Sequence, residues 1–181
     1  MSTKHTIMKS ILLFLLLTPF VITGQNTTGN PELITQKMAL LSNWVGQWTG
    51  EGTISMMGET YDFVQTEDIR FTLDGQVLVI EGIGHLKDNP EEKVHHAFAT
   101  ISYHPDQSAY IMRSYTNEGL YTDATVEVID EVTFKWHFDV PQGRILYKIE
   151  NDGTSWSESG SYQNDSGMSF PFFDMLIHKN Q

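Results

Sequence analysis

An all-β fold is predicted by this sequence: an up-and-down barrel of about ten antiparallel strands, preceded by one N-terminal helix. From residue 47 onward, apolar and polar residues alternate with the period of two that is typical of strands. Short segments rich in Gly, Asn, Asp and Pro interrupt the alternation and indicate tight turns. No second helical pattern separates the strands, so neighbours can pair as hairpins, and a long meander curls to close its edges. A β-sandwich is the alternative.

The first 24 residues have the pattern of a secretory signal peptide. Lys4 and Lys9 precede an apolar run over residues 11–22, and Gly24 provides a small residue at the expected cut. A transmembrane anchor is the alternative, but the run is short and a polar segment follows it. We therefore expect a signal peptide over residues 1–24, a linker over 25–30 and a single domain over 31–181, with a periplasmic or secreted location.

The composition argues against several classes of partner and site. The formal net charge is −12, and removal of residues 1–24 would take away two lysines and no acid, giving −14. Such a surface repels nucleic acid and anionic membranes, and no membrane insertion is expected after signal removal. The chain has no cysteine, which excludes disulfides, thiolate metal sites and cysteine nucleophiles. The sequence does not indicate an oligomeric state.

The predicted helix begins at Asn30, which is a suitable N-cap, with Pro31 at the first helical position and Glu32 in the first turn. Gly46 ends it. An apolar stripe at helical spacing predicts a face that packs on the barrel. The stripe consists of Ile34, Met38, Leu41 and Val45, widened by Leu33, Leu40 and Trp44.

The turn residues and the alternation together place ten strands. Typical breaks are Asp74-Gly75 and Asn117-Glu118-Gly119. The predicted strands are Gln47–Met57, Thr60–Leu73, Gln76–His85, Val94–Tyr103, Ala109–Thr116, Leu120–Ile129, Val132–Val140, Arg144–Glu150, Ser155–Tyr162 and Ser169–His178.

Alternation also predicts which side chains face the barrel interior. Trp136 lies between Phe134 and Phe138 at the apolar positions of its strand, so all three are expected to point inward. Glu67 shares a face with Tyr61, Phe63, Gln65, Ile69 and Phe71, and Glu158 shares one with Trp156 and Tyr162. Two glutamates are therefore predicted on inward, aromatic faces.

The middle hairpins are assigned by pairing Tyr103 with Tyr110 across the turn at Pro105. This pairing puts Phe98, Arg113 and Tyr115 on one face, which we expect to be the inner one. His96, Thr100 and, from the preceding hairpin, Glu81 join the same face. A slip of one residue would invert the whole set.

Buried carboxylates need a partner, because an unpaired charge is costly in an apolar core. Arg113 could pair with a glutamate, the glutamates could be protonated, or the interior could be a hydrated cavity that holds a small-molecule ligand. The alternative to a cavity is a structural polar plug. The residues expected to bind the ligand are Glu67, Phe98, Arg113, Tyr115, Trp136, Trp156 and Glu158. Gly82 and Gly84 indicate a bend at a barrel corner, or else a close approach of the ligand.

A helix that runs into Gly46-Gln47-Trp48-Thr49-Gly50 resembles the calycin superfamily, which includes the lipocalin and fatty-acid-binding barrels. Other matching segments are Phe71–Gly75, Ala99–Tyr103, Tyr110–Tyr115, Trp156–Glu158 and Phe173–Ile177. Within that superfamily the chain is most similar to small bacterial proteins of unknown function, over about residues 31–179. The resemblance implies a ten-stranded barrel and no settled activity.

More distantly, the chain resembles the nitrobindins, which hold haem through a histidine near the end of the last strand. The corresponding position here is Phe172, and His178 lies further along the strand. We expect no cofactor, with haem bound through His178 as an alternative. Neither do we expect a metal site, because the adjacent His95 and His96 point to opposite faces of a strand. An enzyme using Glu67 and Glu158 as acid and base, or a filled barrel that binds a protein, are further alternatives.

Overall fold

The computed structural model describes residues 29–181, and its first element is the helix α1 (Pro31–Met38). The Asn30 side chain accepts a hydrogen bond from the Leu33 backbone N–H at 3.1 Å, which confirms the N-cap. The prediction of one helix up to Gly46 is wrong in its second half, because a 3₁₀ helix, η1 (Ala39–Trp44), follows α1. Residues three apart eclipse in a 3₁₀ helix, so Leu41 and Trp44 both turn toward the barrel.

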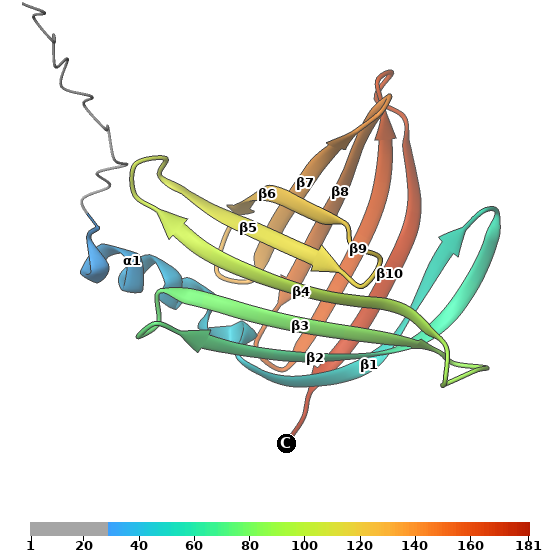
Figure 1. The fold of residues 1–181 in the computed structure, drawn as a ribbon, viewed down its shortest axis with the longest axis horizontal. Helices are drawn as coiled ribbons and strands as arrows, with labels where there is room; N and C mark the ends of the chain where they lie inside the picture. Colours follow the sequence, from blue (N-terminus) through green and yellow to red (C-terminus); the bar gives the residue numbers. More distant parts are fainter. Residues whose placement is uncertain (1–28) are drawn as a thin grey trace, which may run out of the picture.

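Ten antiparallel strands form a closed barrel, which confirms the predicted fold class and makes the β-sandwich alternative wrong (Figure 1). Each strand pairs with its neighbours in the chain, and β1 pairs with β10 to close the ring. The strands are β1 (Gly46–Met56), β2 (Glu59–Thr72), β3 (Val77–Leu86), β4 (Lys93–His104), β5 (Ala109–Thr116), β6 (Tyr121–Val128), β7 (Thr133–Val140), β8 (Gly143–Asn151), β9 (Ser155–Asn164) and β10 (Ser169–Lys179).

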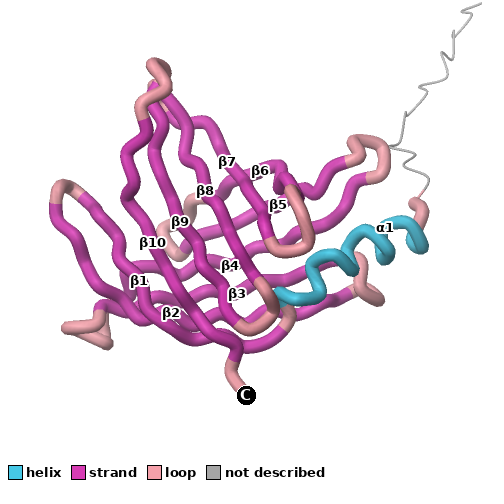
Figure 2. The backbone as a smooth tube through the Cα atoms, turned by 180° about the vertical axis from the view of Figure 1, so that it is seen from behind, coloured by secondary structure: helices cyan, strands magenta, loops and turns pink. Residues whose placement is uncertain are grey.

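The helical segment is fixed at one end of the barrel, beside the β2–β3 and β4–β5 turns (Figure 2). The Tyr110 hydroxyl donates a hydrogen bond to the Lys37 carbonyl at 2.8 Å. The Lys37 ammonium lies 5.7 Å from the ring centroid of Tyr103. These contacts join α1 to both strands of the β4–β5 hairpin and set the direction in which η1 enters the barrel.

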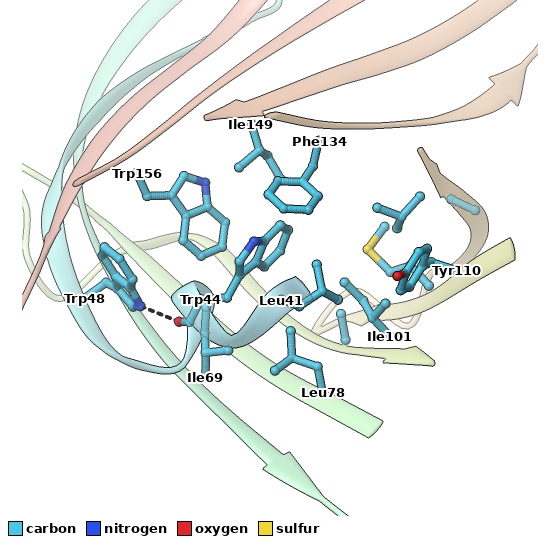
Figure 3. Close-up of a cluster of buried hydrophobic side chains, with 14 of the residues drawn as sticks. Leu41, Trp44, Trp48, Ile69, Leu78, Ile101, Tyr110, Phe134, Ile149 and Trp156 are labelled. Atoms are coloured by element: carbon cyan, nitrogen blue, oxygen red, sulfur yellow. Dashed lines mark hydrogen bonds between the residues drawn. The ribbon is translucent and has the colours of Figure 1, made fainter. Parts of the chain in front are cut away.

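The apolar core lies where η1 enters the barrel (Figure 3). The Trp44 ring lies 5.0 Å from Phe134 and 4.9 Å from Trp156, centroid to centroid. The Trp48 indole N–H donates to the Trp44 carbonyl at 2.8 Å, so η1 is bonded to β1 as well as packed. Inward residues of the strands complete this core, among them Ile69, Leu78, Ile101 and Ile149.

The expected signal peptide, residues 1–24, lies outside the described residues, as does most of the expected linker. Within residues 29–181 no helix is long and apolar enough to cross a membrane.

Candidate functional site

A cavity of about 220 Å³ lies inside the barrel, beyond the apolar core formed around η1. Trp44 and Ile101 border it on the core side. Its other side reaches Thr116 and Phe138, close to the turns at the end of the barrel opposite the helix. The packed helical end and the cavity therefore divide the barrel interior between them.

Small side chains on the middle strands create this space. Ala97 and Ala99 of β4 and Ser114 and Thr116 of β5 line the cavity. These two strands pair so that Ala97 lies opposite Thr116 and Ala99 opposite Ser114. A barrel of this size with large residues at all of these positions would be filled, so the cavity follows from the sequence of β4 and β5.

Aromatic side chains from β7, β8 and β10 form the opposite wall. Trp136 and Tyr147 are stacked, with ring centroids 4.2 Å apart and planes 9° from parallel. Phe138 extends the stack from Trp136 at 5.9 Å, and Phe173 meets Tyr147 edge-on at 5.9 Å. We call Trp136, Phe138, Tyr147 and Phe173 the aromatic wall. All four line the cavity, and they offer an apolar body a large and rigid contact surface.

Glu67 on β2 is the first of two carboxyl groups in the cavity. Its side chain is 9% exposed, and its Oε1 accepts a hydrogen bond from the Gln65 amide at 2.7 Å. Burial raises the pKa of Glu67 to about 7, although the Gln65 hydrogen bond acts against the rise. The group is therefore close to half ionised at neutral pH.

Glu158 on β9 is the second carboxyl group, and it lies near the aromatic wall. Burial raises the pKa of Glu158 to about 8; the charge of Glu67 contributes to the rise, while the indole groups of Trp136 and Trp156 oppose it. The two carboxyl groups, on β2 and β9, line the same cavity. The same Glu158 charge adds to burial in raising the pKa of the Tyr147 phenol.

Gly82 on β3 makes room for the first carboxyl group. It pairs with Glu67 in the sheet, and a Cβ at this position would lie 2.5 Å from Oε1 and 2.6 Å from Oε2 of Glu67. Gly84 stands in the same relation to Gln65, whose Oε1 would lie 2.7 Å from such a Cβ. The two glycines are therefore explained by the Gln65–Glu67 pair, rather than by a barrel corner or a ligand that approaches the backbone.

We expect Gly82→Ala to lower the free energy of unfolding by about 1–3 kcal/mol, because the new methyl group overlaps the Glu67 carboxyl. Adding Glu67→Ala should recover part of that loss, because it removes the overlapping atoms. The measurement is a double-mutant cycle by urea unfolding at pH 6. Equal losses for Gly82→Ala with and without Glu67 would contradict this account.

Several polar atoms at the cavity have no hydrogen-bond partner. Among residues 29–181, five buried side-chain nitrogen or oxygen atoms are unpartnered. Four of them belong to cavity residues: Nε1 of Trp44, Oε2 of Glu67, Oγ1 of Thr116 and Nε1 of Trp156. Buried polar groups are almost always satisfied, so these four atoms are the polar groups of the lining residues that lack a partner within the described chain.

The structure brings together four of the predicted site residues, Glu67, Trp136, Trp156 and Glu158, around the cavity. The expectation that Phe98, Arg113 and Tyr115 face inward is wrong. Phe98 is 39% and Tyr115 46% exposed, and they pair with each other on the outer face of β4 and β5.

Arg113 is also on the outer face, where it forms a two-pronged ion pair with Asp123 on β6, at 2.5 and 2.6 Å. It therefore does not bridge to a cavity glutamate. The predicted pairing of Tyr103 with Tyr110 is confirmed, but Phe98, Arg113 and Tyr115 lie on the outer face of this hairpin and not on the inner one. The signal that could have corrected it is the parity of Ile101, Tyr103, Tyr110 and Met112, all of which are buried. The same parity would have revealed the missed lining residues Ala97, Ser114 and Thr116.

The histidines do not assemble into a metal site in the described part of the chain. His95 lines the mouth of the cavity, whereas His96 lies near Glu81 at 3.3 Å on the outer side. No group of three or more His, Asp or Glu side chains within residues 29–181 is arranged to hold a metal ion. His178 is exposed on β10, next to the buried Ile177, so it points away from the interior. The residues present do not fit a haem held by His178.

No family model and no curated protein sequence matches the chain. The structure is similar to Rv2717c from M. tuberculosis, with a TM-score of 0.62 and 11% identity over 82% of this chain and 99% of that one. It is also similar to the S-type phycobiliprotein lyase CPES from Guillardia theta, with a TM-score of 0.53 and 10% identity over 82% of this chain and 94% of that one.

The fold is that of a calycin-like barrel. At these identities the likeness concerns the fold alone, so the site must be interpreted from its own residues.

Proposed function

We propose that this calycin-like barrel is an exported protein that binds a small, partly apolar molecule inside the barrel. The observation that carries the proposal is the cavity of about 220 Å³, which has an aromatic wall on one side and the carboxyl-bearing residues Glu67 and Glu158 in its lining. Sites for small molecules are typically concave and mainly apolar, with a few polar groups that fix orientation. Export, to the periplasm or outside the cell, is supported by the signal-like pattern of residues 1–24.

A ligand would be oriented by two chemically different parts of the cavity lining, one aromatic and one polar. Its apolar body would pack on the stacked rings of Trp136 and Tyr147, and its polar atoms would meet Glu67 and the indole N–H of Trp156. Such a molecule would restore the hydrogen bonds that these buried groups lack. A filled, purely structural barrel would leave the same groups unsatisfied at a cost of about 1–3 kcal/mol each.

Native mass spectrometry tests this proposal. The protein is expressed as the full 181-residue chain and purified without added ligand. We expect a reproducible excess mass of small-molecule size, removed by denaturation, and a protein mass that corresponds to cleavage after Gly24. A haem-sized excess would contradict the conclusion that the residues present do not fit haem.

The matched variants place a phenylalanine on the inner or on the outer face of the same strand, β4. Ala97→Phe projects into the cavity and should abolish the excess mass, whereas Thr100→Phe projects from the outer face and should preserve it. Circular dichroism confirms that both variants are folded. Retention of the ligand by folded Ala97→Phe, or its absence from the parent protein after purification, would count against binding in the cavity.

A further inference from the structure

The cavity has an unusual charge balance for a small-molecule site. Within residues 29–181 its lining includes the carboxyl groups of Glu67 and Glu158 but no Lys or Arg. His95 at the mouth is the one further basic side chain among these lining residues, and burial lowers the pKa of its imidazole, which favours the neutral ring. An anionic ligand would therefore find no positive partner and would be repelled by any ionised glutamate.

The position of the carboxyl groups adds to this argument. Glu67 is buried, and its Oε2 has no hydrogen-bond partner, although its Oε1 is bonded to Gln65. Gly82 leaves space for the carboxyl group where any other residue would displace it. The fold thus holds an acidic group with a free acceptor oxygen at a cavity wall, which is a costly arrangement unless something binds to it.

The aromatic wall lies next to the second carboxyl group. Glu158, Trp136 and Tyr147 all line this part of the cavity. An ammonium group placed here would meet a carboxylate beside the aromatic wall, whose rings also line the cavity. Carboxylates combined with aromatic faces are the usual means by which proteins recognise organic cations.

We propose that the ligand of this cavity is a small organic cation, a primary amine with an apolar body, whose ammonium group binds the carboxylates of Glu67 and Glu158. This inference rests on the proposed function and assigns its ligand class. A hydroxyl or carbonyl oxygen elsewhere on the amine would accept hydrogen bonds from the unpartnered indole N–H groups of Trp44 and Trp156. The formal net charge of −12 would also draw a cation toward the protein and repel an anion.

Binding of such a cation is coupled to release of a proton. At neutral pH the pKa of about 7 leaves Glu67 about half protonated, and the pKa of about 8 leaves Glu158 mainly protonated in the empty cavity. An ammonium group favours the ionised carboxylates, so its affinity should rise between pH 5.5 and pH 8.5. The other titratable groups that face the cavity are His95, whose lowered pKa favours the neutral ring, and Tyr147, whose raised pKa keeps the phenol protonated throughout.

The test compares amines with alcohols of the same shape. Isothermal titration at pH 8.5 uses three pairs: tyramine and tyrosol, tryptamine and tryptophol, and benzylamine and benzyl alcohol. We expect the amine of at least one pair to bind about tenfold more tightly than its alcohol, a ratio within the range of a carboxylate pair reinforced by a cation–π contact. At pH 5.5 the ratio should fall to about twofold or less, because both carboxyl groups are then protonated.

The matched variants locate the effect. Glu158→Gln should weaken amine binding by about tenfold and change alcohol binding by no more than about twofold. Glu127→Gln, on the outer face of β6, should change neither. The isosteric replacement keeps the volume of the side chain, and circular dichroism shows whether the fold is retained.

The outcomes separate this inference from the proposed function. If the alcohols bind as well as the amines, or if none of the six probes binds while the purified protein carries a neutral or anionic molecule, the amine inference is wrong and the proposed function stands. If neither a probe nor a retained molecule occupies the cavity, both are wrong.

Discussion

The double variant Glu67→Gln/Glu158→Gln is expected to be much more stable than the parent protein at pH 9 and of similar stability at pH 5. In the unfolded chain both carboxyl groups have a pKa near 4.5, whereas in the fold burial raises these values to about 7 and about 8. Between pH 4.5 and pH 8 the folded state therefore binds more protons than the unfolded state. The parent must lose stability as pH rises through this range.

The size of the loss follows from the two pKa shifts. The shift is worth about 3 kcal/mol at Glu67 and about 5 kcal/mol at Glu158, so the pair accounts for several kcal/mol at pH 9. Glutamine remains neutral at every pH in this range, and a glutamine at position 67 can still accept a hydrogen bond from Gln65. The variant should therefore avoid this loss of stability and melt about 20 °C above the parent at pH 9.

Thermal unfolding from pH 4.5 to pH 9 measures this effect. The exposed Glu127→Gln serves as the control and should follow the parent at every pH. A parent whose stability is flat or rises across the range would show that the carboxyl groups stay ionised or solvated in the ligand-free barrel.

Replacement of Trp44 by alanine should have the second large effect. The side chain is 2% exposed and contacts Phe134 and Trp156, so its removal leaves a void at the centre of the core. Truncation of a buried tryptophan typically costs about 3–5 kcal/mol. Because Trp44 also borders the cavity, the void should join it and admit bulkier ligands.

Urea unfolding measures this cost, with Leu40→Ala as the matched control. Leu40 lies in the same 3₁₀ helix but is 43% exposed, so its truncation should cost less than about 1 kcal/mol. If the two variants lose the same free energy, η1 does not act as the packed end of the barrel.

Most of the fold could be predicted because the strands carry a clear period-two pattern and the turns carry Gly, Asn and Asp. Trp136, Trp156, Glu67 and Glu158 were placed correctly for the same reason, since each lies on a strand whose inward face is marked by large apolar neighbours. The 3₁₀ continuation of the helix could not be predicted, because its apolar spacing also suits an α-helix.

The alternation of large apolar and polar residues gave the wrong inner face for β4 and β5, because the barrel is hollow at their level. Phe98 and Tyr115 are large and aromatic but lie outside, while Ala97 and Thr116 are small and lie inside. A rule that sends large apolar residues inward assumes a filled interior, and a cavity requires the opposite at the strands that make room for it. Glu67 has room for its carboxyl group because Gly82 on the neighbouring strand has no side chain. This relation involves two strands, so no single segment of the sequence reveals it.

Closure of the ring through β1 and β10 affects the order in which the strands can pair as the chain folds. Trp48 lies opposite Lys179, so the two strands that complete the barrel come from opposite ends of the described chain. A chain that emerges from its N-terminal end can form its hairpins one after another, but β1 cannot complete its pairing until β10 is present. Until Lys179 has emerged, β1 and the most recent strand present unpaired edges that other chains can join. Chaperones that shield such edges while the barrel is still open would therefore matter more for this protein than for one whose neighbouring segments complete the fold as they appear.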